Sequence, residues 1–354
     1  MKTKKLLAKN LRYVLLAGVA ALGLITILAT GGGGGVTTTT SGTTYNSGGS
    51  IGDLLTYTVN TSNLSYSYNI VESDFGLAGT TGSGTLTQNA DNTYTPSSDP
   101  NARLILLPNT LLVGGADVGL ANPMLFAGVP ALTTSYTPAE IAGTYNYITF
   151  ACDGPLVGGV CTAGYSSDYG TYKVNADYTW ESCDEGDIDD QAAHPCSHTD
   201  NGTWTDLGNG RIKVESATAE IAKIMLLPSA SGGKVMIGDL KNVDLPSYQQ
   251  GPGLLVGVKR QDLTGLDLTG DFYFNEDEGA YGDVSVGDGT VAAPTYSGNH
   301  YDSGGVNHQT ISGTLTRNDP WTGWLRDTNT IVLILPGDGV WFATDRSTTD
   351  WIQA

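Results

Sequence analysis

One pattern of twelve residues occurs three times in this chain. It reads GTLTQNADNTYT at residues 84–95, GTYKVNADYTWE at 170–181 and GTLTRNDPWTGW at 313–324. Apolar residues or threonines flank an Asn/Asp-rich centre in each copy, and Asn and Asp close tight turns. Each copy therefore predicts a β-hairpin, and we expect the three hairpins to hold equivalent positions in three repeated units.

A second pattern follows each hairpin: an apolar run, a proline, a polar or glycine turn, and another apolar run. The first run and its proline read LILLPN (104–109), IMLLPS (224–229) and VLILPG (332–337). Because proline cannot continue a central ladder, each is expected at the corner between two buried strands. From the leading glycine to this proline the chain spans 24, 58 and 23 residues in the three copies. The middle value predicts a long insertion in copy two.

Two further strands frame the repeat. Aromatic opening strands start at Ile141 (IAGTYNYITF) and Leu268 (LTGDFYFNED), with a looser match at Asn63 (NLSYSYNIVE). The closing strands PMLFAGVP (123–130) and PGLLVGVK (252–259) resemble one another, whereas no such strand is expected in copy three. The GTY-type opening is similar to the first strand of lipocalin-like barrels; the likeness is limited to these few residues, and no ligand pocket is inferred from it.

Composition favours strands over helices. The chain has 354 residues with 48 glycines, and 18 tyrosines against 6 phenylalanines, which is typical of short strands joined by glycine turns. We predict an all-β fold of three sequence-related antiparallel β-meander units, arranged as barrels, a sandwich or a ring, with almost no helix after the N-terminal segment. The expected units span residues 51–135, 136–262 and 263–354.

The N-terminus is typical of a bacterial export signal. A basic segment, MKTKKLLAKNLR, precedes the uncharged apolar run YVLLAGVAALGLITILAT and a Gly/Thr/Ser-rich stretch. Residues 1–31 are thus predicted to be an export signal or membrane anchor, and residues 32–50 a flexible linker. Both cleavage and anchoring stay open, because the apolar run is near the lower limit for spanning a bilayer. We expect a protein of the periplasm, outer surface or extracellular space.

The charge balance bears on partners. The formal net charge is −19, and residues 1–31 hold five of the 17 basic residues and no acidic one. The remaining chain is therefore strongly acidic and repels phosphate backbones, so nucleic acid is not expected as a partner. We expect an envelope or extracellular partner, and membrane contact only through an uncleaved N-terminal segment.

All four cysteines fall in copy two: Cys152, Cys161, Cys183 and Cys196. An even number in an exported protein predicts two disulfides, and pairing in sequence order would close two local loops. Zinc is the alternative, since His194 and His198 flank Cys196 in HPCSH and zinc binds thiolate and imidazole. The spacing, however, matches no common zinc module.

Two acidic stretches are candidate calcium sites, because calcium needs six to eight oxygen ligands. No EF-hand pattern is present, and the alternative is a solvated acidic loop. The candidate ligands are Asp184, Asp187, Asp189, Asp190, Asn275, Asp277, Glu278 and Asp283.

Loops on a β scaffold often carry binding sites, and the histidines of this chain lie in such segments. The candidate ligand-loop residues are His194, His198, His300, Asp302 and His308. No GxSxG elbow or oxyanion-hole signal accompanies them, so no catalytic residue is assigned.

The sequence favours a non-enzymatic exported β-repeat protein that binds, scaffolds or displays. The alternative is an extracellular carbohydrate-binding protein or glycoside hydrolase that uses carboxylates of copies two and three. A hydrolase needs two carboxyl groups at a defined separation. Paired carboxylates in a deep cleft lined with tryptophan would favour the enzyme, and filled interiors with flat faces would favour a scaffold.

Overall fold

The computed structural model describes most of the chain from Gly42 to Gln353. The described residues are 42–89, 93–100, 102–116, 124–132, 135–216, 219–228, 234–246, 248–275, 281–301, 308–328, 330–335, 340–345 and 351–353. Their regular structure is antiparallel β apart from the short helix α2 (Pro138–Ile141), which confirms the all-β prediction. No helix among these residues is long and apolar enough to cross a membrane. The predicted export signal or anchor, residues 1–31, lies outside the described residues.

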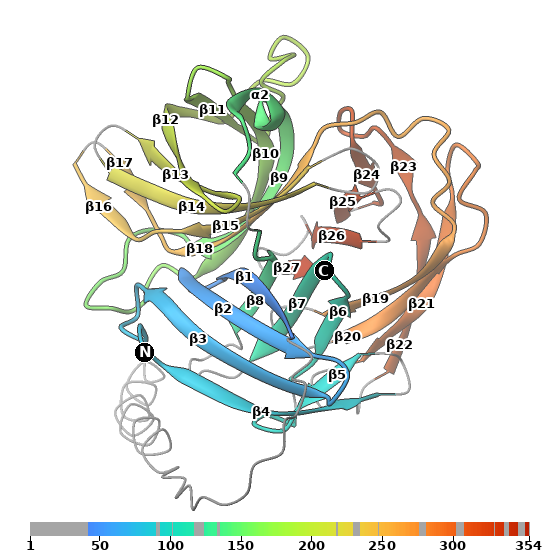
Figure 1. The fold of residues 1–354 in the computed structure, drawn as a ribbon. Coiled ribbons are helices and arrows are strands. Elements are labelled where there is room, and N and C mark those ends of the chain that lie inside the picture. Colours follow the sequence, from blue (N-terminus) through green and yellow to red (C-terminus); the bar gives the residue numbers. More distant parts are fainter. Residues whose placement is uncertain are drawn as a thin grey trace, which may run out of the picture. The chain divides into compact units, whose positions relative to one another are not determined.

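The first unit is a closed barrel in which each strand pairs with its sequence neighbour and β8 closes onto β1 (Figure 1). Its strands are β1 (Thr43–Gly49), β2 (Asp53–Asn60), β3 (Ser65–Ser73), β4 (Thr81–Gln88), β5 (Tyr94–Pro96), β6 (Leu104–Leu107), β7 (Leu111–Ala116) and β8 (Met124–Pro130). Aromatic rings pack through its interior: Tyr57 stacks on Tyr66 at 5.5 Å and on Phe126 at 5.6 Å between centroids. Side chains of this size fill a small barrel.

Strand β1 lies in the segment predicted to be a flexible linker, residues 32–50, and that prediction is wrong for residues 43–49. The small residues are needed for close packing. A Cβ on Gly48 would come within 3.0 Å of the Gly238 carbonyl oxygen of the second barrel, and one on Gly128 would overlap the Ser47 hydroxyl. The first unit therefore begins at β1 rather than at residue 51, and residues 32–41 lie outside the described residues.

The second unit is also a closed barrel, because β18 pairs with both β15 and β9. Its strands are β9 (Gly143–Cys152), β10 (Tyr165–Val174), β11 (Thr179–Asp184), β12 (His198–Gly208), β13 (Arg211–Ser216), β14 (Ala219–Pro228), β15 (Lys234–Leu240) and β18 (Gly253–Lys259). A small hairpin, β16 (Val243–Leu245) with β17 (Tyr248–Gln250), is inserted between β15 and β18. We call this hairpin the lid hairpin.

The third unit forms two sheets rather than a closed barrel. The first holds β19 (Gly270–Asn275), β20 (Tyr281–Val286), β21 (Thr295–Tyr301) and β22 (His308–Thr314); the second holds β23 (Thr316–Arg317), β24 (Trp324–Arg326), β25 (Thr330–Leu335), β26 (Val340–Asp345) and β27 (Trp351–Gln353). Only Leu315 separates β22 from β23, so the chain changes sheets there. Because β27 pairs with β26, the expectation of no closing strand in copy three is wrong.

The three repeated hairpins do not hold equivalent positions. Residues 84–95 and 313–324 each begin on the fourth strand of their unit, which is β4 in the first unit and β22 in the third. Residues 170–181 instead form β10–β11, the second and third strands of the second barrel. The counterpart in the second barrel is GTWTDLGNGRIKV, which begins at Gly202 on β12. The looser opening match at Asn63 is likewise wrong, since it covers β3 and the first strand is β1.

An aromatic residue paired with a glycine recurs in all three units and supports this corrected alignment of the repeats. Across neighbouring strands the pairs are Tyr66 with Gly84, Trp180 with Gly202, and Tyr296 with Gly313. The missing side chain of each glycine leaves room for the ring opposite it. From Gly202 to Pro228 is 26 residues, close to the spacing in the other two units. The predicted insertion after Gly170 is therefore a consequence of the wrong alignment.

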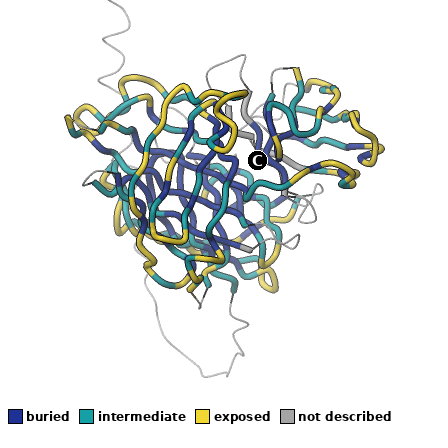
Figure 2. Tube along the Cα trace, turned by 90° about the horizontal axis from the view of Figure 1, so that it is seen from above, coloured by how far each residue is buried: buried dark blue, intermediate teal, exposed yellow. Residues whose placement is uncertain are grey.

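The proline-cornered runs do hold equivalent positions. Leu106 on β6, Leu226 on β14 and Ile334 on β25 each pack with the interior of their own unit. Strands β8 and β18 are almost entirely buried on both faces, as Figure 2 shows for the central strands. Their outer faces join one core shared by all three units, which includes Leu125, Val256 and Leu333. Burial on both faces explains why these strands read as continuous apolar runs.

Candidate ligand-binding site

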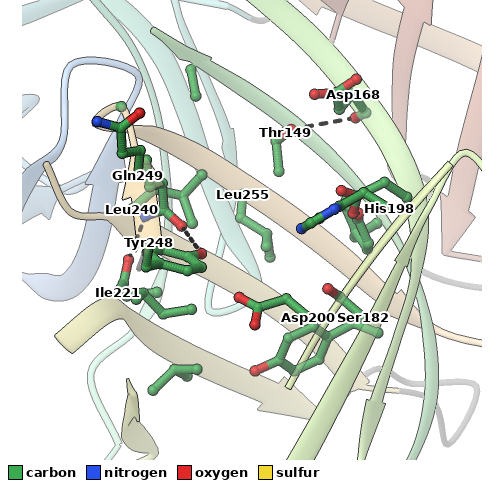
Figure 3. A pocket seen from close by; sticks show the side chains of 18 of the residues that line it. Thr149, Asp168, Ser182, His198, Asp200, Ile221, Leu240, Tyr248, Gln249 and Leu255 are labelled. Carbon is green, nitrogen blue, oxygen red and sulfur yellow. Dashed lines mark hydrogen bonds between the residues drawn. The ribbon is translucent and has the colours of Figure 1, made fainter. Parts of the chain in front are cut away.

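A cavity of about 360 Å³ lies inside the second barrel, a volume within the range of small-molecule sites. Its walls come from strands β9–β15 and β18, and the lid hairpin contributes Tyr248, Gln249 and Gln250. Figure 3 shows the labelled side chains of Thr149, His198 and Asp200 around this common space. The first barrel packs aromatic rings through its interior, whereas this barrel keeps space beside its aromatic residues.

One row of paired residues crosses four strands at the cavity. The register aligns Tyr147 on β9 with Gly170 on β10, Asp184 on β11 and His198 on β12. The Tyr147 hydroxyl donates a hydrogen bond to Asp184. A Cβ on Gly170 would lie 3.0 Å from the Tyr147 hydroxyl, so this glycine lets the tyrosine reach across β10.

Burial makes the carboxylates of the cavity unusual. It raises the pKa of Asp184, and the hydrogen bond from Tyr147 and the nearby His198 only partly oppose that effect. Burial also raises the pKa of Asp168, and the charge of Asp184 raises it further. Removing a carboxylate from water disfavours its charged form. Asp184 is half-buried, so its charge is only partly compensated by Tyr147 and His198, whereas Asp168 is exposed and solvent still reaches its carboxylate.

The neighbouring row contains Tyr172, Ser182 and Asp200. Tyr172 is buried, and its hydroxyl has no hydrogen-bond partner although it lines the cavity. Its ring stacks on Trp180 at 5.1 Å between centroids. Unpaired buried hydroxyls are rare in native proteins, because each costs the free energy of a lost hydrogen bond to water.

Asp200 has one satisfied oxygen and one unsatisfied oxygen. Its Oδ1 accepts a 3.0 Å hydrogen bond from the Ser216 hydroxyl. Burial raises the pKa of Tyr248, and the charge of Asp200 and a side-chain hydrogen bond with it raise that pKa further. The donor geometry of the Tyr248 hydroxyl nevertheless favours Gln250, to which it donates at 2.8 Å. The buried Oδ2 of Asp200 is therefore left without a donor.

The lid hairpin is attached on both sides. Gln250 Nε2 donates to the carbonyl oxygens of Ile221 at 2.7 Å and Lys241 at 3.0 Å. At the start of the connection, the backbone N–H of Asn242 donates to Asp74 of the first barrel at 2.7 Å. The lid is thus fixed to the first barrel as well as to its own.

The predicted disulfides are confirmed in sequence order, Cys152–Cys161 and Cys183–Cys196. The thiols are therefore not available as zinc ligands. The second disulfide joins the end of β11 to the segment just before β12, next to the pair of Asp184 and His198. It closes the loop that precedes two cavity residues.

The acidic loop after Asp184 forms ion pairs with basic side chains. Arg260 contacts Asp187 at 2.6 Å and Asp189 at 3.2 Å, and Lys173 contacts Asp189 at 2.8 Å. Within the described part of the chain, no group of three or more His, Cys, Asp or Glu side chains is arranged to hold a metal ion. The geometry of this loop is thus that of an ion-pair network.

The other sequence candidates are dispersed. Asp190 accepts a hydrogen bond from the Ala193 backbone, and His194 lies 5.6 Å from the Trp321 ring. Asn275 ends β19, Asp283 on β20 accepts hydrogen bonds from Asn299, and His300 and His308 lie on the paired strands β21 and β22. Asp277, Glu278 and Asp302 lie outside the described residues, so calcium near residues 275–283 stays a prediction. Of the candidates that the structure describes, Asp184 and His198 line the cavity.

The cavity residues that sequence reasoning missed are Tyr147, Asp168, Tyr172, Asp200 and Tyr248. For Asp168 and Tyr172, the alternation of side chains between the two faces of a strand gave a signal in the sequence. Asp168, Gly170 and Tyr172 alternate along β10, so an aspartate on that face points to the same side as a buried tyrosine.

Comparison of the chain with models of known protein families finds no match, and comparison with curated proteins finds no significant relative.

Proposed function

We propose that this chain is an exported, non-enzymatic binding protein whose second barrel holds one small organic molecule. The observation that carries the proposal is the buried, unpartnered Tyr172 hydroxyl at a cavity of about 360 Å³. A polar group in that position is satisfied when a ligand supplies its hydrogen bond. Small closed barrels are wide enough to hold one small ligand.

The remaining units fit a supporting role. The first barrel has an aromatic interior and holds the lid connection through Asp74. Export is supported by the basic and apolar N-terminal sequence and by two disulfides, which persist in oxidising compartments. We expect the protein in the periplasm, on the outer surface or outside the cell, with an envelope or extracellular partner.

A fragment screen tests this function. A library with equal numbers of cationic, neutral and anionic fragments is screened by ligand-observed NMR against the wild type and a cavity-blocked variant. Ala222→Phe is the first blocked variant, because buried Ala222 lines the cavity, and Thr149→Phe is the second in case the first does not fold. The proposal predicts hits that both folded variants lose. If no fragment of any charge shows cavity-dependent binding, the proposal is wrong.

A second candidate function is glycoside hydrolysis. It is favoured by one observation: Asp168, Asp184 and Asp200 share a cavity with Trp180, and a raised carboxyl pKa suits a general acid. Release of a chromophore from nitrophenyl glycosides, lost in Asp184→Asn, would support this alternative. Absence of turnover across a panel of such glycosides would leave the binding function as the better account.

A further inference from the structure

The charged side chains that line the second-barrel cavity are predominantly acidic. Among the described lining residues these are Asp153, Asp168, Asp184, Asp200 and His198, with no lysine or arginine. The Ser166 hydroxyl donates to Asp153 at the edge. The inner carboxylates therefore have a single basic neighbour in the lining, His198.

Carboxylates elsewhere in the chain show that the protein can pair such groups. Asp187 and Asp189 contact Arg260 just outside the barrel. At the junction of the two barrels, Glu72 contacts Lys223 and Lys241. A buried charge without a partner is costly to the folded state. The absence of lysine and arginine from the described cavity lining is thus a distinctive feature of this site.

Asp184, Asp200 and the Tyr172 hydroxyl lie close enough together for one small molecule. Asp200 pairs with Ser182 and His198 pairs with Asp184, so Asp184 and Asp200 are diagonal neighbours on β11 and β12, for which the spacing across a strand pair is about 7–8 Å. Tyr172 pairs with Ser182 from the other side. Its unpartnered hydroxyl and the unsatisfied Oδ2 of Asp200 therefore belong to one row.

We propose that the ligand of this cavity is a small organic cation, a primary amine with an apolar or aromatic body, whose ammonium group binds Asp184 and Asp200. This inference rests on the proposed binding function. An ammonium group offers three hydrogen-bond donors and a positive charge, and charge-assisted hydrogen bonds to carboxylates are stronger than neutral ones. The Tyr172 hydroxyl accepts a further hydrogen bond.

The apolar wall fits the body of such a ligand. The aromatic stack of Tyr172 and Trp180 and the side chains of Ile224 and Leu255 line the same cavity. A neutral polyol would satisfy hydrogen bonds but leave the carboxylate charges uncompensated, and an anion would add repulsion. A bare metal ion would leave the apolar wall unused.

Isothermal titration calorimetry with three matched probes tests the ligand class. The probes are 2-phenylethylamine, 2-phenylethanol and phenylacetate, which share a ring and differ in charge. We expect the amine to bind at least tenfold more tightly than the alcohol, and the anion more weakly than both. Asp184→Asn and Asp200→Asn should each weaken amine binding about tenfold while changing alcohol binding less than twofold. Asp206→Asn, at an exposed position of β12 that does not line the cavity, is the matched control and should change neither.

The outcomes separate this inference from the binding function. Equal or tighter binding of the alcohol or the anion, lost in Ala222→Phe, would overturn the amine assignment and keep the cavity as a binding site. Amine binding that survives in Asp184→Asn, Asp200→Asn and their double variant would also overturn it. If no probe and no fragment binds in a cavity-dependent way, the binding function fails as well. Circular dichroism of each variant establishes that it is folded.

Discussion

Tyr66 on β3 lies directly opposite Gly84 on β4, and a Cβ on Gly84 would come within 3.0 Å of the tyrosine ring. The Tyr66 hydroxyl continues past the glycine to donate to Ser98 at 2.7 Å. In the second barrel, the Trp180 indole passes Gly202 and donates to the Glu215 carbonyl at 3.0 Å. The aromatic–glycine pair thus connects three successive strands, β11, β12 and β13, in the second barrel, and in the first barrel it links β3 and β4 to the turn that follows β5.

This relationship predicts the effect of adding one methyl group. In Gly202→Ala the new Cβ would collide with the Glu215 carbonyl oxygen and press on Trp180, which should destabilise the fold by about 1–3 kcal/mol. Gly287→Ala is the matched control, because nothing lies within 4 Å of a Cβ there. Urea denaturation measures both. Equal midpoints for the two variants would contradict the proposed role of the pair.

The Cys183–Cys196 disulfide should stabilise the fold and the cavity together. It closes a loop with a sequence separation of 13 residues, for which removal costs about 3 kcal/mol. In Cys183→Ser/Cys196→Ser we expect this loss in urea denaturation and weaker ligand binding, because Asp184 and His198 flank the loop. Mass spectrometry of the intact wild type should show a gain of four hydrogens on reduction, two for each disulfide. A variant with unchanged binding would show that the loop does not position these residues.

Two buried carboxyl groups predict how stability depends on pH. Burial raises the pKa of Asp53 to about 6 and that of Asp239 to about 7, above the value near 4 of an unfolded chain. The native state therefore binds these protons more tightly than the unfolded state. Their contribution to the free energy of unfolding is present below about pH 4 and is lost as the pH rises to about 7.

Asp53→Asn isolates this effect, because it replaces a fully buried carboxyl with a neutral group of the same size, whereas Ser73 and Lys241 oppose only part of the effect of burial on its pKa. The substitution should flatten the pH profile between about pH 4 and pH 6 and raise stability at pH 7 by about 1–3 kcal/mol. Asp244→Asn, at an exposed position, serves as the control. Chemical denaturation at several pH values measures the profile. A parallel loss of stability at every pH would mean that Asp53 acts through packing instead.

The connection to the lid hairpin predicts a kinetic effect. Asp74→Ala removes the acceptor of the Asn242 backbone N–H and should loosen the lid. We expect faster association and faster dissociation of the amine probe in stopped-flow tryptophan fluorescence, with an affinity changed less than either rate. Asp99→Ala, in a turn of the first barrel and outside the lid contact, is the control. Unchanged association and dissociation rates would show that this hydrogen bond does not hold the lid.

The sequence predicted much of the fold because the buried strands carry strong local signals. The runs around Pro108 and Pro228 are apolar on both faces, so their burial could be recognised without knowing the strand order. Register was harder to predict. The Asn-Ala-Asp turn after Gly170 resembles the turn after Gly84 more closely than its true counterpart at Gly202 does, because turn chemistry depends on local residues and not on strand position.

Only part of the cavity could be predicted from the sequence. The acidic residues Asp184 and Asp187 are three positions apart, yet one lines the cavity and the other pairs with Arg260. Which side a carboxylate faces depends on where β11 ends and the disulfide loop begins, and that boundary has no clear sequence signal. Tyr248 reaches the cavity only because the lid hairpin folds across the barrel, which is a tertiary arrangement.

A crystal structure of the protein with bound 2-phenylethylamine would show where an organic cation binds. We expect one amine inside the second barrel, with its nitrogen within hydrogen-bond distance of Asp184 or Asp200 and its ring against the Tyr172–Trp180 stack. An amine bound only at the outer surface, or a barrel interior in which the Tyr172 hydroxyl has collapsed onto Asp200 and closed the cavity, would contradict this expectation.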